Sequence, residues 1–429
     1  MTSSNIPSHG QIVQSSVLKP SKDTSYMVDG LELHNVIVPV LAKRKSSFDR
    51  NTLRSLSSIN RAFWKAIPRI MCLLETDFSP ILAERYDYAE QTEIDPQRVE
   101  MATAAFVACG LDPGRLVRLL NRQFTGEDRR VKEILREARR SGISDEDYQH
   151  IKRILTQGCP ARLVHLERQE DKIRMMERGN QKSLLDNPEI ERQALNKEDK
   201  NSHVIVLEEW VCLFSPYSRH TVQGLVLKIG SNPRWVWDGS TMLTPWDKVM
   251  NEITSTELEA EITFGGVEQL FLRHLYNLRV TYPNLEIFIA TADIKACFCF
   301  PRISPDLTGA FGFFADGYYC LPTAMVFGSN TSATSWEPFR RAIEGLSVVY
   351  ANRQDLVEKH AWYLQMIGWD QRSPTTITRA VGCVMNPGVL DEQGNEILEP
   401  ARFYVDDALI ATCGVMKMKM ALAAVIEAI

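Results

Sequence analysis

Two short apolar segments of the chain carry carboxylates where a fold selected only for stability would avoid them. The stretch "FYVDDALIA" (403–411) sets Asp406 beside Asp407, and the run "LEIFIATADI" (285–294) ends in Asp293 and Ile294. Burying neighbouring carboxylates without a partner is costly, so the pair must lie on a turn or hold a cation. Two strands that bring such acids to one sheet edge can hold two Mg²⁺ ions about 3.5–4 Å apart, as in phosphoryl transfer.

The carboxylate oxygens of these aspartates are suitable ligands for a hard cation such as Mg²⁺. Mg²⁺ takes oxygen ligands and keeps several positions for water and substrate phosphates, so two or three protein carboxylates suffice. A single acid at a strand end is more often a cap or turn residue. The hypothesis therefore depends on Asp293 and the pair Asp406 and Asp407 meeting in space, with two Mg²⁺ ions, or Mn²⁺ in their place, as the predicted cofactors.

Four motifs in order resemble one family. "ADIKACFCFPRI", "MVFGSNTSATSWEPF" and "FYVDDALIA" resemble the palm motifs of reverse transcriptases, most closely those of long-terminal-repeat retrotransposons, and "KIGSNPRWVWDGS" upstream is similar to their fingers hairpin. The resemblance covers about residues 200 to 412, and the order of the motifs makes it specific where any single motif would be weak. It implies an α+β right-hand polymerase of fingers and palm, with an antiparallel palm sheet and packed helices.

The resemblance also implies roles for the acids and for one backbone group. Asp293 and Asp406 would bind the two metal ions, and Asp407 would be a weaker ligand or a structural acid. The carbonyl of Ile294 would add an oxygen. The implied reaction is RNA-directed DNA polymerisation, with a primed RNA or DNA template and a deoxynucleoside triphosphate (dNTP) as partners.

Five further residues are implied on the nucleotide side. Arg234 and Lys228 would neutralise the triphosphate, Phe298 would exclude a 2′-hydroxyl, and Phe327 with Gly328 would lie near the nascent base pair. Outside the resemblance, four of these residues have an ordinary interpretation. Arg234 and Lys228 would be exposed hairpin residues, Phe298 a core residue and Gly328 a turn residue.

Periodicity and composition predict the organisation of the chain. Residues 1–50 are predicted to be a disordered or loosely packed arm, 51–175 a helical region of unknown role, 176–202 a linker, and 203–429 the fingers and palm. Ser144 is predicted to cap a helix whose one face carries Tyr148, Ile151 and Leu155. Arg and Lys in this region alternate with Glu and Asp, which favours a solvated, ion-paired face over a nucleic-acid surface.

Within residues 203–429 the patterns of apolar and polar residues predict individual strands and helices. We expect strands around 203–214, a hairpin over 224–240, a helix over 265–278 and, at 285–294, a strand buried on both faces. A further hairpin is expected to feed the acidic turn, after an insertion in the segment that follows Gly328. The stretch after Asp407 is expected to begin a helix on the palm, which leaves no sequence for a thumb or ribonuclease H domain, so we expect a polyprotein fragment.

Two other functions stay open on the sequence alone. A non-catalytic retroelement remnant, or an assembly module that self-associates through the N-terminal helices, would retain the motifs without the activity. An RNA-directed RNA polymerase would also use paired aspartates, but bulky Phe298 argues against it. Whether the fragment acts as an enzyme by itself is not determined by these patterns.

The composition further limits which classes of protein the chain can belong to. The 429 residues are 44% hydrophobic and 24% charged, with a formal net charge of -5, so any nucleic-acid contact is expected to be a local groove. Nine scattered cysteines form no disulfide framework and no Cys/His spacing typical of a zinc site. The start lacks signal-peptide features and no apolar run approaches a membrane span. We expect an intracellular soluble protein of cytoplasm or nucleus, without a membrane partner.

Overall fold

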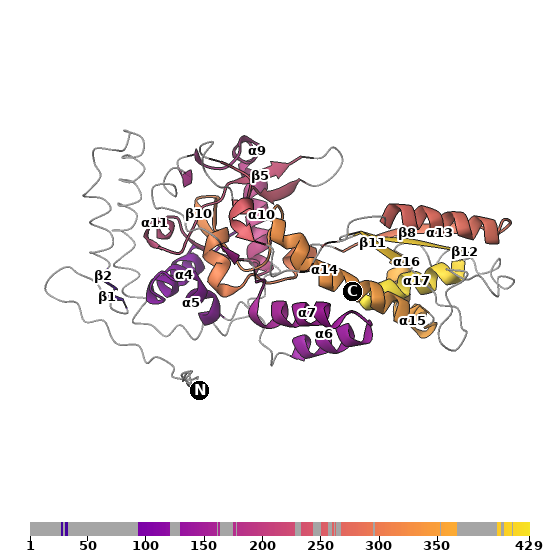
Figure 1. Ribbon diagram of the computed structural model, residues 1–429. Helices are drawn as coiled ribbons and strands as arrows, with labels where there is room; N and C mark the ends of the chain where they lie inside the picture. Colours follow the sequence, from indigo (N-terminus) through magenta and orange to yellow (C-terminus); the bar gives the residue numbers. More distant parts are fainter. Residues whose placement is uncertain are drawn as a thin grey trace, which may run out of the picture.

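A computed structural model describes most of the chain from residue 93 onward. It covers residues 27–28, 31–32, 93–120, 129–160, 162–163, 175–176, 178–227, 233–242, 250–255, 260, 262, 267–294, 297–351, 353–366, 401–404, 407–413 and 415–429. These form an elongated body of helices and small antiparallel sheets (Figure 1). The architecture is α+β, as predicted. No helix in these ranges is both long and apolar enough to cross a membrane.

One end of the body is built on a three-stranded antiparallel sheet in the order β4-β10-β9. Its strands are β4 (Val204–Glu208), β9 (Phe313–Ala315) and β10 (Tyr318–Pro322). Ile205 and Leu207 of β4 pack towards the helices α4 (Pro96–Ala108) and α5 (Pro113–Leu119), whereas Val204 and Val206 join the larger core. Because both faces of β4 are buried, its sequence is a continuous apolar run.

The predicted hairpin lies beside this sheet. Strands β5 (Gln223–Val226) and β6 (Arg234–Trp237) pair antiparallel, with Gln223 opposite Trp237. Trp237 is buried against Phe311, and Trp235 meets Phe313 edge to face. The two tryptophans therefore fix the root of the hairpin on the body.

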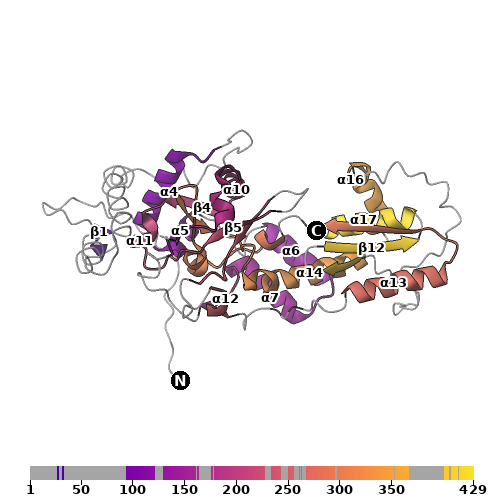
Figure 2. The ribbon, with the colours of Figure 1, turned by 90° about the horizontal axis from the view of Figure 1, so that it is seen from above.

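Three helices form the middle of the molecule. The long α14 (Asn330–Tyr350) packs on α6 (Arg129–Arg140) and α7 (Asp145–Gln157), as Figures 1 and 2 both show. Ser144 caps α7 as predicted, because its hydroxyl accepts a hydrogen bond from the Asp147 amide at 3.0 Å. Ile151 and Leu155 are buried in the core that α14 shares.

The other end carries a second three-stranded antiparallel sheet in the order β11-β12-β8. Its strands are β8 (Ile287–Asp293), β11 (Ala401–Tyr404) and β12 (Asp407–Cys413). Helices α13 (Val267–Thr281) and α17 (Val415–Ala428) cover opposite faces of this sheet (Figure 2). Both helices were predicted, α17 as the packing helix after Asp407.

Two expectations about buried and exposed segments differ from the structure. The segment expected to be a linker contains α9 (Lys182–Leu185) and α10 (Pro188–Lys200), and Leu195 of α10 is fully buried. The few apolar residues of this polar segment suffice because the neighbouring sheet completes their packing. The strand at 285–294 is not buried on both faces, since Ile289 of β8 is 54% exposed.

The expected helical region does not stand apart from the rest. Core residues of α4 to α7 pack with residues of β4, β10 and α14, so the described helices share their cores with the later chain. Most of the basic residues of α6 lie in ion pairs, including Arg129 with Glu133 and Arg139 with Asp145. These pairs agree with the expected solvated face.

Short elements complete the described chain. They are β1 (Met27–Val28), β2 (Leu31–Glu32), β3 (Arg162–Leu163), α11 (Val211–Phe214), α12 (Met250–Ile253), β7 (Thr254–Ser255), the 3₁₀ helices η1 (Cys297–Cys299) and η2 (Pro305–Phe311), α15 (Asp355–Lys359) and α16 (Ala361–Met366). The helix α11 occupies the last four residues of the region 203–214, so the prediction of a strand was wrong there and right for β4. The hairpin expected to feed the acidic turn lies outside the described residues, apart from β11.

Candidate metal and nucleotide site

Asp293 and Asp407 are brought together by strand register. Asp293 is the last residue of β8 and Asp407 the first of β12, and they are direct partners in the antiparallel ladder. Opposite residues of such a pair project from the same face with Cβ atoms about 4.5–5.5 Å apart. Both residues are exposed, and within the described chain neither carboxylate has a hydrogen-bond or ion-pair partner. Two carboxylates therefore face each other, and no described positive charge neutralises them.

The sheet exposes this pair on one particular face. Ala408 and Ile410 of β12 lie on the other face, in the core with α14 and α17. On the face of Asp293 and Asp407, α13 covers only the far end, where Leu278 packs on Ala411. The acidic end of that face therefore stays open, and Ile289, which lies opposite Ala411 on the edge strand β8, is exposed as well.

The turn that bears Asp406 is bounded by well-placed strands. Tyr404 of β11 pairs with Asp407 of β12, which leaves a two-residue connection. Asp406 itself lies outside the described residues. Phe403 is fully buried beside Ala408 and anchors the hairpin from beneath. Ile294 is buried, and its carbonyl already accepts a hydrogen bond from the Cys297 amide at 3.3 Å.

Three of the predicted nucleotide-side residues form a continuous cluster. The rings of Phe298 and Phe327 lie 6.0 Å apart between centroids, tilted by 52°. The guanidinium carbon of Arg234 stands 5.9 Å from the Phe327 centroid, within the range of a cation–π contact. Arg234 and Phe327 are exposed and Phe298, on η1, is half-buried. Lys228 lies outside the described residues.

Gly328 is required by the backbone around it. Its φ is +115°, and a Cβ atom there would lie 2.0 Å from the Trp237 carbonyl oxygen. The Trp237 amide donates to the Phe327 carbonyl at 2.9 Å, so β6 and this loop are in direct contact. This packing accounts for the glycine without any nucleotide.

Asn251 is a residue that sequence inspection missed. Its side-chain amide donates to the Gly328 carbonyl at 3.1 Å, and its side-chain oxygen accepts from the Asn330 amide at 3.1 Å. Asn251 thus fixes the loop of Phe327 and Gly328 at the start of α14. No pattern around Asn251 signals this contact, which exists only after folding.

A buried ionic network supports the strand before the acidic turn. Arg340 of α14 donates to Glu337 at 2.8 Å and to Glu344 at 2.6 Å, and it reaches the Phe403 carbonyl of β11 at 3.4 Å. Burial alone would lower the pKa of Arg340, but hydrogen bonds and the charges of Glu337 and Glu344 raise it above the ordinary value. Arg340 therefore stays charged and links α14 to β11.

The residues at the open sheet face fit a hard divalent cation. Like charges placed directly opposite on neighbouring strands repel one another, and a cation bound by both would remove this cost. Both donors are carboxylate oxygens, the ligands that Mg²⁺ prefers. The agreement between ligands and cation refers to Asp293 and Asp407, because Asp406 lies outside the described residues.

No protein-family model matches the chain, and no curated protein matches it. Two solved structures are similar to it: a foamy viral protease-reverse transcriptase in complex with double-stranded DNA, and a foamy viral protease-reverse transcriptase in complex with an RNA/DNA hybrid. Each is 14% identical with a TM-score of 0.28, and the alignments cover 70% and 71% of this chain. This chain spans 41% and 33% of the length of those proteins. At this similarity no residue can be placed by superposition, so the candidate site rests on this chain's own geometry and motifs.

Proposed function

We propose that residues 203–429 are the fingers and palm of a reverse transcriptase, an RNA-directed DNA polymerase of retrotransposon type. The observation that carries the proposal is the register of Asp293 opposite Asp407 on the open end of an antiparallel sheet. This arrangement supports the role of the ordered motifs, because it brings an acid of one motif against an acid of another. The proposed reaction joins a dNTP to a primer 3′-hydroxyl on an RNA or DNA template.

Asp293, Asp406 and Asp407 are the proposed carboxylate ligands of two Mg²⁺ ions, or of Mn²⁺. When bound, such a pair of ions stabilises the attacking and the leaving oxygen of an in-line displacement. The chain's own contribution is to hold the carboxylates on a rigid sheet. Phe403, buried beneath the turn, and Arg340, bonded to its carbonyl, provide that support.

The cluster of Arg234, Phe298 and Phe327 is the proposed nucleotide side of the site. Arg234 is exposed on β6 and would neutralise triphosphate charge. Phe298 follows Asp293 by five residues and would restrict space at the sugar 2′ position. Phe327 and Gly328 would border the nascent base pair, and Lys228 would assist Arg234.

Primer extension on an RNA template with Mg²⁺ tests the proposal. The chain should extend the primer with dNTPs, and Asp293→Asn should reduce the rate by at least about a hundredfold, since one ligand of the transition-state charge is lost. The matched control is Asp186→Asn, an exposed acid beside α9 without a described partner, which should leave the rate unchanged. Equal rates for the wild type and Asp293→Asn would refute the proposal.

The helical assembly module receives less support from the described helices. Phe106, Leu116 and Ile151 lie in cores shared with the sheet and α14, so their apolar surface is used within the chain. Self-association through α4 to α7 would have to use their polar faces.

A further inference from the structure

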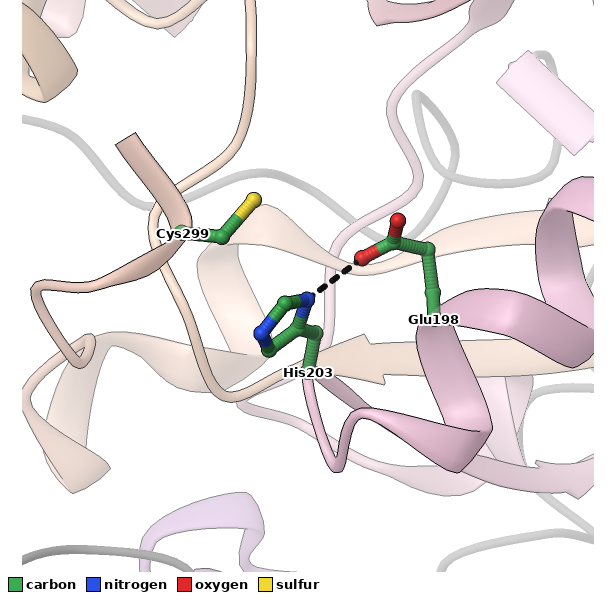
Figure 3. A group of neighbouring side chains, drawn as sticks. All are labelled: Glu198, His203 and Cys299. Atoms are coloured by element: carbon green, nitrogen blue, oxygen red, sulfur yellow. Dashed lines mark hydrogen bonds and ion pairs between the residues drawn. The ribbon is translucent and has the colours of Figure 1, made fainter. Parts of the chain in front are cut away.

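Three side chains of zinc-ligand type converge at the junction of α10, β4 and η1, away from the acidic sheet edge. They are Glu198 in the last turn of α10, His203 immediately before β4, and Cys299 at the end of η1. One ligand atom from each lies within 4.8 Å of the others (Figure 3). The Nδ1 atom of His203 is 2.7 Å from a carboxylate oxygen of Glu198.

The backbone that presents these side chains is held on several sides. The His203 amide donates to the Glu198 carbonyl at 2.9 Å, and the His203 carbonyl accepts from the Thr323 amide at 2.7 Å. On the side of Cys299, the Phe300 amide donates to the Cys297 carbonyl at 3.1 Å and closes η1. Arg302, which follows η1, donates to the Ser202 carbonyl at 2.8 Å, so the segment of Cys299 is tied to the junction that bears Glu198 and His203.

A nucleophilic Cys–His–Glu arrangement explains the cluster less well. Such a site needs the histidine to accept a proton from the thiol, yet no hydrogen bond joins Cys299 to His203 in the described structure.

We propose that Glu198, His203 and Cys299 bind one Zn²⁺-class divalent ion through a carboxylate oxygen, an imidazole nitrogen and a thiolate. This set of nitrogen, sulfur and oxygen donors is the one Zn²⁺ accepts, with a fourth position left for water. Zn–S and Zn–N bonds of about 2.3 and 2.0–2.1 Å place tetrahedral donors roughly 3.3–3.6 Å apart, so the thiol need move by no more than about 1.5 Å. The hydrogen bond between Glu198 and His203 would give way to the metal.

The ion would tie three parts of the fold together. Glu198 and His203 belong to the α10–β4 junction, and Cys299 follows Phe298 directly on η1. Binding would therefore fix η1, and with it the half-buried Phe298, against the sheet of β4. The site is distinct from the carboxylate pair, because Mg²⁺ prefers oxygen donors and a thiolate selects softer metals. It stands whether or not the chain is a polymerase.

Metal titration of the full chain tests the proposal. After chelator treatment and dialysis, the chain should take up one equivalent of Zn²⁺, and Co²⁺ in its place should give a thiolate-to-cobalt charge-transfer band. Cys299→Ser should abolish the band, and His203→Gln should weaken binding by at least about tenfold. Cys109→Ser, which alters a partly buried cysteine outside the cluster, should bind as the wild type does.

A second measurement needs no variant and so does not depend on the folding of one. In the wild type, saturating Zn²⁺ should slow alkylation of Cys299, measured by peptide mass spectrometry, while that of Cys109 stays unchanged. Failure of the chain to take up stoichiometric Zn²⁺, binding that persists in Cys299→Ser, or alkylation of Cys299 that ignores Zn²⁺ would each overturn the proposal. None of these outcomes bears on primer extension, so the two proposals fail separately.

Discussion

Asp293 and Asp407 face each other across neighbouring antiparallel strands, and no described cation neutralises either of them. Directly opposed like charges destabilise a strand pair by roughly 0.2–1 kcal/mol. The chain keeps this unfavourable pair at the open end of a sheet whose other residues pack well. The proposed divalent ion would remove this cost.

Asp407→Asn should therefore make the chain more stable when no divalent ion is present. Removing one of the two charges relieves the repulsion, so the free energy of unfolding should rise by about 0.2–1 kcal/mol. Mg²⁺ should raise the melting temperature of the wild type and do so less in the variant. Thermal denaturation with and without Mg²⁺ measures both effects, with Asp186→Asn as the control. A variant that responds to Mg²⁺ as strongly as the wild type would speak against a cation at Asp407.

Gly328→Ala should destabilise the contact between β6 and the loop before α14. The matched control is Gly317→Ala, since Gly317 also has a positive φ of +80° but has no atom within 4 Å of an added Cβ. Each alanine adopts a strained backbone at a cost of about 1–3 kcal/mol, and Gly328→Ala also clashes with the Trp237 carbonyl. Urea denaturation should show the larger loss for Gly328→Ala, and equal losses would contradict the geometry.

Arg340→Leu should be among the most damaging single changes in α14. It removes two hydrogen bonds to Glu337, whose side chain is 4% exposed, but leaves the ion pair of Glu337 with Arg341 at 3.0 Å, so the cost should be at most the about 3–5 kcal/mol of breaking one side of a buried pair. Arg353→Leu removes an exposed pair with Asp355 and should cost no more than about 1 kcal/mol. Denaturant titration compares the two variants. If the cost at Arg340 arises from the weakened pairing of the buried Glu337, the double change Glu337→Leu with Arg340→Leu should recover part of it.

Phe298→Ala should relax the choice of sugar if the proposed function holds. A smaller side chain leaves room for a 2′-hydroxyl, so the ratio of kcat/KM for deoxynucleotides over ribonucleotides should fall by at least about tenfold. Phe300→Ala alters a neighbouring aromatic that packs on Trp336 and Phe339, and it should leave the ratio unchanged. Single-nucleotide incorporation measures the ratio, and an unaltered ratio in Phe298→Ala would remove Phe298 from the nucleotide side.

Stability should fall with acid partly through His220. Burial lowers the pKa of His220 to about 3, and within the described residues neither ring nitrogen has a hydrogen-bond partner. The unfolded state binds the proton more readily, so this contribution is full above pH about 6.5 and is lost as pH falls towards about 3. The slope from one group is at most about 1.4 kcal/mol per pH unit. Denaturation at several pH values should show a smaller slope in His220→Leu, and identical slopes would show that His220 protonates freely in the folded state.

Local patterns were enough to predict several elements. Ser144 caps α7 because its hydroxyl needs only an amide three residues away, and the hairpin of β5 and β6 follows from apolar strands around a turn. The polar segment with α10 was less predictable, because Leu195 is buried only against a sheet formed by later residues. The exposure of Ile289 could not be predicted, again because it depends on residues far away in the sequence. An apolar strand looks buried on both faces until its position in the sheet is known, and β8 lies at the edge.

The sequence by itself determined the ordered motifs, the acids Asp293, Asp406 and Asp407, and the strands and helices that carry most of them, because these depend on neighbours along the chain. Only the tertiary structure decided that Asp293 faces Asp407, that Gly328 lies against Trp237, and that Arg340 reaches Phe403. It also decided that Glu198, His203 and Cys299 meet, although the cysteine spacing predicted no zinc site. Each of these relationships joins residues far apart in sequence, and strand register and side-chain packing, which set such distances, exist only in the folded chain.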